Sequence, residues 1–140
     1  LERVLQYRKL VKDEKMRELL LRNHKLMEDS ERLRELQAAE LLNRIEAGVE
    51  LNAAQLQLLA DYGCRLREEI SEQKEVVERS KEAVQAATAE YLEAAKDEKS
   101  LNIHKQRKLS EYRQYTQQVE DKNIDELNVQ RVGLTRRIKE

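Results

Sequence analysis

Small and apolar residues repeat every seven positions through the middle of the chain, and this repeat constrains the fold more than any other feature. Two series show it: Gly63, Ile70, Val77, Val84 and Tyr91 form one, and Leu59, Leu66, Gln73, Ser80, Ala87, Ala94 and Leu101 form the other. The two series are offset by three and four residues, as are the a and d positions of a coiled coil. The repeat therefore predicts one long helix that packs its seam against another helix.

Composition favours a coiled coil over a compact domain or a disordered chain. Charged residues make up 39% of the 140 residues, aromatic residues make up 4%, and Pro, Trp and Phe are absent. A compact core normally relies on large aromatic side chains, whereas this mixture is typical of long helices. A disordered chain shares the polarity but lacks regular apolar spacing.

One short interval, at residues 47–52, interrupts the helical pattern. Gly48 is expected to take the left-handed conformation that ends many helices. Asn52 and Gln55 have the spacing of a helix N-cap and its reciprocal partner in a capping box. These signals predict that one helix ends before the interval and another begins after it.

The expected fold is all-α: a long antiparallel two-helix coiled-coil hairpin with a longer, partly overhanging second helix. We predict the first helix over about 1–46 and the second over about 53–135, which makes 1–140 a single hairpin domain. A loop of about six residues at 47–52 requires the helices to fold back on each other.

The apolar pattern of the first helix is less regular than that of the second. Val4 and Val11 form a pair of their own, which predicts a shift of register before Leu19. The apolar positions that follow are Leu19, Leu26 and Leu33, then Leu20 and Met27, and nearer the loop Leu36, Leu41, Leu42 and Ile45.

The two helices differ in length, so part of the second helix is expected to lack a partner. At ~1.5 Å per residue the second helix extends on the order of 120 Å and the first on the order of 70 Å. The first helix should therefore cover the second only to about residue 98. Seam positions Glu98, Lys105 and Lys108 are charged, which agrees with an overhang over 99–140.

Charge is divided between the segments of the chain. Residues 47–98 hold six basic and twelve acidic side chains, and residues 99–140 hold ten basic and six acidic ones. The overhang is thus basic and the first part of the second helix is acidic. Such asymmetry favours oppositely charged partners and orients their docking.

No group of residues suggests catalysis or cofactor binding. His24 and His104 lie in different arms, outside any metal-binding frame, and no glycine-rich phosphate loop is present. We therefore expect no enzyme activity and no catalytic, cofactor-binding or metal-binding residues. The single Cys64 fits a reducing compartment, and no apolar stretch approaches the ~18 residues of a membrane span. Together these features predict a cytoplasmic protein.

The overhang could in principle hold nucleic acid, because basic and aromatic side chains can contact phosphates and stack on bases. Six acidic residues lie among them, so we expect a protein partner and no nucleic acid. The residues expected to bind this partner are Lys105, Arg107, Lys108, Tyr112 and Arg113.

Four segments resemble the flagellar export protein family FliJ. ISEQKEVVERSKEAV at 70–84 resembles its I-x-x-Q-x-x-x-V-x-x-A-x-x-x-V stretch, and KQRKLSEY at 105–112 its basic Lys-Leu-Glu segment. DELNVQR at 125–131 resembles its D-E-L-x-x-x-R ending, and LERVLQYR at 1–8 its L-x-x-V-L-x-x-R opening. Ser80 stands where the family usually has a small Ala. The resemblance covers nearly the whole chain.

The resemblance implies a non-enzymatic stalk or adaptor of the bacterial flagellar type III export apparatus. The family's partners are the export ATPase ring, the export gate protein and the export chaperones, at the cytoplasmic face of the flagellar base. The basic overhang is expected to face the ATPase. The gate is expected to meet the loop end through Leu42, Gln55, Leu58 and Tyr62. A stalk homologue of a virulence injectisome and a generic coiled-coil tether are the alternatives.

Overall fold

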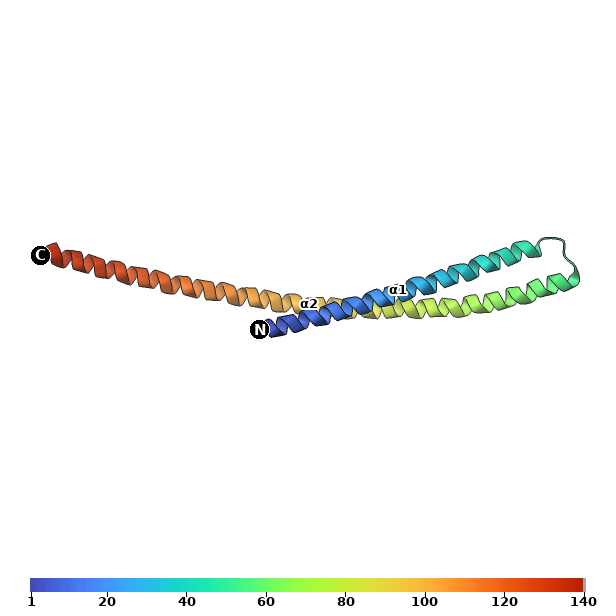
Figure 1. The fold of residues 1–140 in the computed structure, drawn as a ribbon, viewed down its shortest axis with the longest axis horizontal. Coiled ribbons are helices and arrows are strands. Elements are labelled where there is room, and N and C mark those ends of the chain that lie inside the picture. The colour runs from blue at the N-terminus through green and yellow to red at the C-terminus, as the bar shows by residue number, and fades with distance from the viewer. Residues whose placement is uncertain (140) are drawn as a thin grey trace.

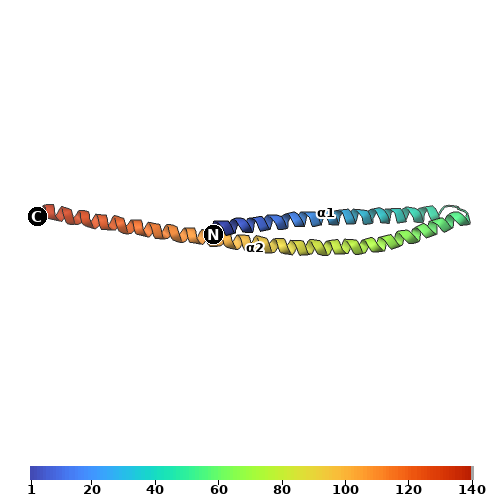
Figure 2. The ribbon, with the colours of Figure 1, turned by 60° about the horizontal axis from the view of Figure 1, so that its bottom comes forward.

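A computed structural model describes residues 1–139 as two long helices, α1 (Glu2–Ala47) and α2 (Ala53–Lys139). They lie side by side and antiparallel, and α2 continues well past the N-terminus of α1 (Figure 1). A view turned by 60° shows the same pairing (Figure 2). The all-α hairpin with a longer second helix is thus confirmed. The sequence-based ranges of about 1–46 and 53–135 differ from these bounds by a few residues.

The turn between the helices combines one confirmed feature with one that differs. Gln55 N donates to Asn52 Oδ1 at 2.8 Å and Asn52 N donates to Gln55 Oε1 at 3.2 Å, so the capping box is present. Gly48, however, has φ −79° and ψ −7°, and the prediction of a left-handed residue is wrong. The last turn of α1 instead narrows to 3₁₀-type hydrogen bonds, in which Gly48 N donates to Ile45 O and Val49 N donates to Glu46 O.

The seam of α2 follows both seven-residue series as far as Lys105. Its buried members are Gly63, Leu66, Ile70, Val77, Ala87 and Ala94, and its half-buried members are Leu59, Gln73, Ser80, Val84, Tyr91, Glu98, Leu101 and Lys105. Because both series lie on the side that faces α1, the predicted seam of the second helix is confirmed.

The seam of α1 keeps one register along its whole length, so the predicted shift before Leu19 is wrong. Leu5 is 5% exposed and lies in the same seven-residue series as Lys12 and half-buried Leu19. This repeat is not evident from the sequence, because the seam position between Leu5 and Leu19 is taken by the charged residue Lys12. Val4 is exposed, and the apolar residues Leu20, Met27, Leu41, Leu42 and Ile45 also lie outside the seam.

The best-packed part of the hairpin lies in its loop-proximal half. Leu36, Leu66 and Ile70 are each at most 7% exposed and pack together, with Leu33 and Ala39 against them. Two helices cannot enclose a side chain from all directions, and each seam residue keeps a solvent-facing edge. The hairpin is therefore held together by successive layers of seam residues from α1 and α2 rather than by a closed core.

Helix α1 covers α2 further than the sequence predicts. Glu2 at the start of α1 pairs with Lys105, 2.6 Å between Oε2 and Nζ, so the expected limit near residue 98 is wrong and the overhang is 106–139. At the loop end, Asn43 contacts Leu59 and lies beside Gly63. The first turn of α2 thus lies beyond the end of α1. Each residue of α1 therefore faces a residue of α2 that is several positions later than the sequence-based alignment gives.

Candidate partner-binding surfaces

A buried carboxylate, Asp29, interrupts the seam midway along α1. It is 6% exposed, its Oδ2 accepts a hydrogen bond from the Ser80 hydroxyl, and its Oδ1 lies 3.2 Å from Lys25 Nζ. Gln73 Nε2 donates to the Asp29 carbonyl at 2.8 Å. Buried polar groups are tolerated when they are paired in this way. Ser80, which departs from the resembled family pattern, therefore has a local role as a partner of Asp29.

A second polar layer lies near the loop, at Asn43. Its side chain is 7% exposed, and Nδ2 donates to Leu59 O at 3.2 Å. The absence of a side chain at Gly63 makes room for it, because a Cβ there would lie 2.7 Å from Asn43 Nδ2. Asn43 Oδ1 has no hydrogen-bond partner. Polar groups at seam positions cost stability and specify register, so this layer helps to define which residues of α1 and α2 face each other.

Charged pairs flank the seam along the N-terminal third of α1, where Leu5 is buried and Leu19 is half-buried. Arg8 lies 3.4 Å from Asp97, Lys12 3.0 Å from Glu98, and Lys15 2.9 Å from Glu90; with Glu2–Lys105 these make four interhelical ion pairs. Exposed ion pairs contribute little each and are screened by salt. This end of the hairpin is therefore its weaker end.

Three of these groups titrate away from their ordinary values. The pKa of Glu2 is lowered, chiefly because its carboxylate accepts a hydrogen bond from Lys105. The pKa of Lys12 is raised by its hydrogen bond to Glu98, and the pKa of Lys15 by its hydrogen bond to Glu90. All three shifts favour the charged forms, which is the sign expected for groups that gain a partner on folding.

The residues expected to face the ATPase separate into two groups. Lys105 is half-buried and forms an ion pair with Glu2, so it belongs to the end of the hairpin. The others, Arg107, Lys108, Tyr112 and Arg113, are exposed on the overhang. They point in different directions around the helix, because successive residues are rotated by about 100°. They provide a basic helix surface on several sides rather than one patch.

The residues expected to face the export gate lie at the loop end, together with apolar side chains that the sequence argument did not single out. Leu42, Leu58 and Tyr62 are 59%, 69% and 46% exposed. Gln55 is exposed but also forms the capping box with Asn52. A hollow of about 420 Å³ is lined by Glu46, Val49, Leu51, Gln55, Leu58 and Leu59. An apolar hollow at the tip of a highly charged molecule is a surface suited to a protein partner.

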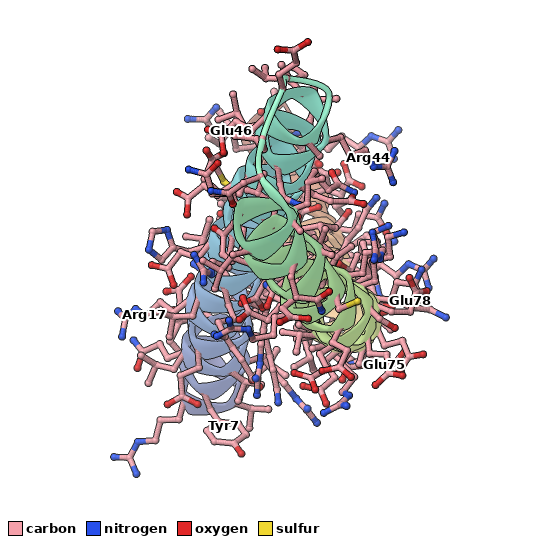
Figure 3. The ribbon with its side chains drawn as sticks, turned by 90° about the vertical axis from the view of Figure 1, so that its right-hand side faces the viewer. Tyr7, Arg17, Arg44, Glu46, Glu75 and Glu78 are labelled. Carbon is pink, nitrogen blue, oxygen red and sulfur yellow. The ribbon has the colours of Figure 1, made fainter. Side chains whose placement is uncertain are left out.

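Figure 3 looks along the hairpin from this loop end. Arg17 projects from α1 on one side, and Glu75 and Glu78 project from α2 on the other (Figure 3). The long sides of the hairpin therefore carry solvated charge, with exposed apolar residues such as Leu21 and Met27 among it.

The histidines and the cysteine lie apart from one another. His24 contacts Glu28 on its own helix at 2.9 Å, and exposed Cys64 accepts a contact from Arg67 Nη2 at 3.4 Å. Among the described residues no cluster of three or more His, Cys, Asp or Glu side chains could hold a metal ion. Within residues 1–139 neither helix combines the length and apolarity needed to cross a membrane.

These features define an elongated coiled-coil protein whose two ends differ in chemistry: a basic single helix at one end and an apolar tip at the other. The family model described as flagellar FliJ protein matches residues 1–137. The chain belongs to this family and is a flagellar export-related protein. Searches of curated proteins and of solved structures returned no match.

Proposed function

We propose that this protein is a non-enzymatic stalk and adaptor of the bacterial flagellar type III export apparatus, at the cytoplasmic face of the flagellar base. The overhang of α2 enters the pore of the export ATPase ring. The loop end of the hairpin contacts the export gate and the export chaperones. Family membership supports the export apparatus as its location, and the different chemistry of the two ends supports two separate partners.

The observation that carries this proposal is the unpaired C-terminal part of α2. Residues 106–139 continue as one helix without any cover from α1 (Figure 1), and they hold eight basic and five acidic side chains. A single helix is about 10–12 Å across, whereas two helices packed ~8–10 Å apart span roughly 20 Å. The overhang alone therefore suits a narrow channel, and the hairpin above it sets how far the helix enters.

The ATPase contact is tested by reversing charge on the overhang. The triple variant Arg107→Glu, Lys108→Glu, Arg113→Glu should lose most of its affinity for the ATPase ring, and the affinity of the native protein should fall as salt is added. Binding is measured by titrating the fluorescently labelled protein with assembled ring.

A matched control carries the same reversals on the hairpin, at Arg17, Arg32 and Arg34, which are also exposed. It should bind as the native protein does. Equal losses in both triple variants would reject the overhang as the ATPase contact.

The gate contact is tested at the tip. Leu58→Glu should weaken binding to the isolated cytoplasmic part of the gate protein, because it places charge beside the apolar hollow. Leu92→Glu is the control: Leu92 is 59% exposed and lies two residues from Glu90, the partner of Lys15, far from the tip. Binding that survives Leu58→Glu unchanged would remove the hollow from the contact.

A further inference from the structure

The overhang carries an apolar stripe that continues the seam of the hairpin. Its members are all exposed, between 39% and 68%: Leu109, Tyr112, Val119, Leu127 and Leu134. Spacings of three, seven and eight residues keep side chains on one face of a helix with 3.6 residues per turn. Leu101, Lys105 and Leu109 follow one another in steps of four, so the stripe begins on the face that α1 covers up to Lys105.

Tyr112 and Val119 still lie in the seven-residue series of Gly63, whereas Leu109 stands in place of Lys108, which the series of Leu59 would give. The two successive steps of four residues from Leu101 to Leu109 shift one of the two series by one position, as a stutter does in a coiled coil. The overhang therefore has not lost its apolar face. One of its two series has moved by one residue, at the point where the N-terminus of α1 stops covering α2.

The surface of the stripe has the shape that a second helix needs. A hollow of about 420 Å³ is lined by Ile124, Leu127, Asn128, Gln130, Arg131 and Leu134. Four of these, at 127, 130, 131 and 134, have the i, i+3, i+4, i+7 arrangement that surrounds a knob in coiled-coil packing. The stripe is thus a coiled-coil surface without its partner helix.

The stripe is also symmetric about Asn123. Moving outward from Asn123 in steps of four, three and four residues gives Val119, Thr116 and Tyr112 in one direction. The same steps give Leu127, Gln130 and Leu134 in the other direction. Apolar residues match apolar residues, and the polar Thr116 matches the polar Gln130.

We propose that a second copy of this chain docks antiparallel on the stripe, over residues 112–134, with the two-fold axis at Asn123. The symmetric spacing then places Val119 against Leu127 of the other copy and Tyr112 against Leu134, each pair twice. The Asn123 amides of the two copies meet at the axis, where each can donate to the other. A polar Asn in an otherwise apolar seam specifies register. A lipid surface would not match the polar residues at 116, 123 and 130.

Charges beside the stripe set the strength of this pairing. Lys122 and Glu126 lie on the same flank, so the two-fold axis brings Lys122 of each copy beside Glu126 of the other. On the opposite flank Arg131 approaches Arg113 of the other copy. The attraction between Lys122 and Glu126 is thus offset by the repulsion between Arg131 and Arg113. We therefore expect a weak dimer whose population depends on protein concentration.

The inference goes beyond the export function and does not rest on it. The dimer covers the overhang, including Tyr112, so the same helix cannot pair with a second copy and enter a ring at once. Self-association is measured on the isolated protein, without any ATPase, so its failure is distinct from a failure of the proposed function.

Cysteine cross-linking tests the axis in the full chain, in a Cys64→Ser background. Under mild oxidation Asn123→Cys should form a disulfide-linked dimer about tenfold faster than Gln118→Cys, because only residues at the axis bring their Cβ atoms near disulfide distance. Gln118 is exposed and lies on the far side of the helix. Equal rates at the two positions overturn the antiparallel arrangement.

Sedimentation equilibrium tests the stripe with matched variants. Leu127→Lys should abolish the dimer, whereas Val129→Lys should leave it unchanged, since Val129 is 72% exposed but lies off the stripe. Arg113→Glu should strengthen the dimer, because it turns the repulsion from Arg131 into attraction. A native chain that stays monomeric at every concentration, or identical behaviour of Leu127→Lys and Val129→Lys, overturns the proposal and assigns the stripe to a different partner.

Discussion

At the scale of single residues, polar groups at seam positions carry much of the information about how the helices pair. Asp29 is 6% exposed and depends on Ser80 and Lys25 for its partners. Asn43 depends on the empty space at Gly63. A slip of α1 along α2 would take Asp29 away from Ser80 and Asn43 away from Leu59 and Gly63, and each buried group would lose its partner on α2.

Removing the Ser80 hydroxyl should destabilise the hairpin. Ser80→Ala leaves a buried carboxylate oxygen short of one donor, and we expect a loss of about 1–3 kcal/mol in the free energy of unfolding. Ser110→Ala on the exposed overhang should have no such effect. Urea unfolding followed by circular dichroism measures both, and equal midpoints for the two variants would contradict a role for Ser80.

The contact between Asn43 and Gly63 predicts a dependence on background. Ala at position 63 should stabilise α2 by about 1 kcal/mol through helix propensity, but only when Asn43 is replaced by Ala. In the native chain the new Cβ would lie 2.7 Å from Asn43 Nδ2 and displace it from Leu59. A double-mutant cycle by urea unfolding measures the coupling, and a gain of the same size in both backgrounds would disprove the contact.

The burial of the α2 seam predicts a sharp contrast between neighbouring positions. Val77→Asp combined with Val84→Asp should destabilise the hairpin by several kcal/mol, because unpaired charge enters the interface. The same change to Asp at Glu75 and Glu78, which project outward (Figure 3), should be nearly silent. Thermal unfolding separates the two pairs, and similar shifts in Tm would mean that the register is wrong.

At the scale of the helices, α1 has two unlike halves. Near the loop it packs through Leu33, Leu36 and Ala39, whereas near its N-terminus ion pairs flank a seam in which Leu5 is buried. The apolar packing near the loop does not depend on pH, whereas each ion pair near the N-terminus requires both of its partners to be charged. The two ends of one helix should therefore respond differently to pH and salt.

The N-terminal third of α1 should detach at both extremes of pH. Lys12 and Lys15 have raised pKa values, so their stabilisation is complete below the ordinary value of 10.5 and is lost as pH rises through the folded pKa values. Glu2 has a lowered pKa, so its contribution is complete above 4.5 and is lost as pH falls through the folded value. Added salt should act in the same direction.

A nitroxide label at Val4→Cys, in the Cys64→Ser background, reports this detachment as increased mobility. The same label at Ala38→Cys, next to Ala39 of the apolar cluster, serves as the control and should change little when the pH is taken well below 4.5 or well above 10.5. Mobility that rises equally at both sites would show that the whole hairpin melts rather than one end.

At the scale of the whole molecule, the hairpin and the overhang are energetically separate. Residues 106–139 continue α2 past the N-terminus of α1, because α1 begins at Glu2 opposite Lys105. The molecule therefore combines a stable hairpin with an arm that is free to bind, and its fold does not depend on that arm.

A chain truncated after Lys105 should keep the unfolding midpoint of the intact protein, because no seam layer is removed. It should lose both ATPase binding and self-association, which are assigned to the overhang. Circular dichroism and sedimentation measure the two properties side by side. A truncated hairpin that unfolds at lower urea concentration would show that the overhang supports the fold.

Much of the fold could be predicted from the sequence because it depends on periodic and local signals. The seam of α2 repeats without a competing apolar face, and the capping box of Asn52 and Gln55 needs only two residues three positions apart. The overhang also follows from length, since a short helix cannot cover a longer one. Of the residues predicted to face the ATPase, those beyond Lys105 lie on the free arm.

Only the tertiary structure decided the register of α1 against α2. Helix α1 has apolar residues on two faces, and Leu5 rather than Val4 enters the seam because that choice sets Leu36 against Leu66 and Ile70. The placement of Lys105 at the end of the hairpin, the burial of Asp29 and the pairing of Lys12 with Glu98 follow from the same register. An interhelical ion pair forms only when the two charged residues face each other. Which residues face each other depends on the register of the two helices, and the sequence of one helix does not determine that register.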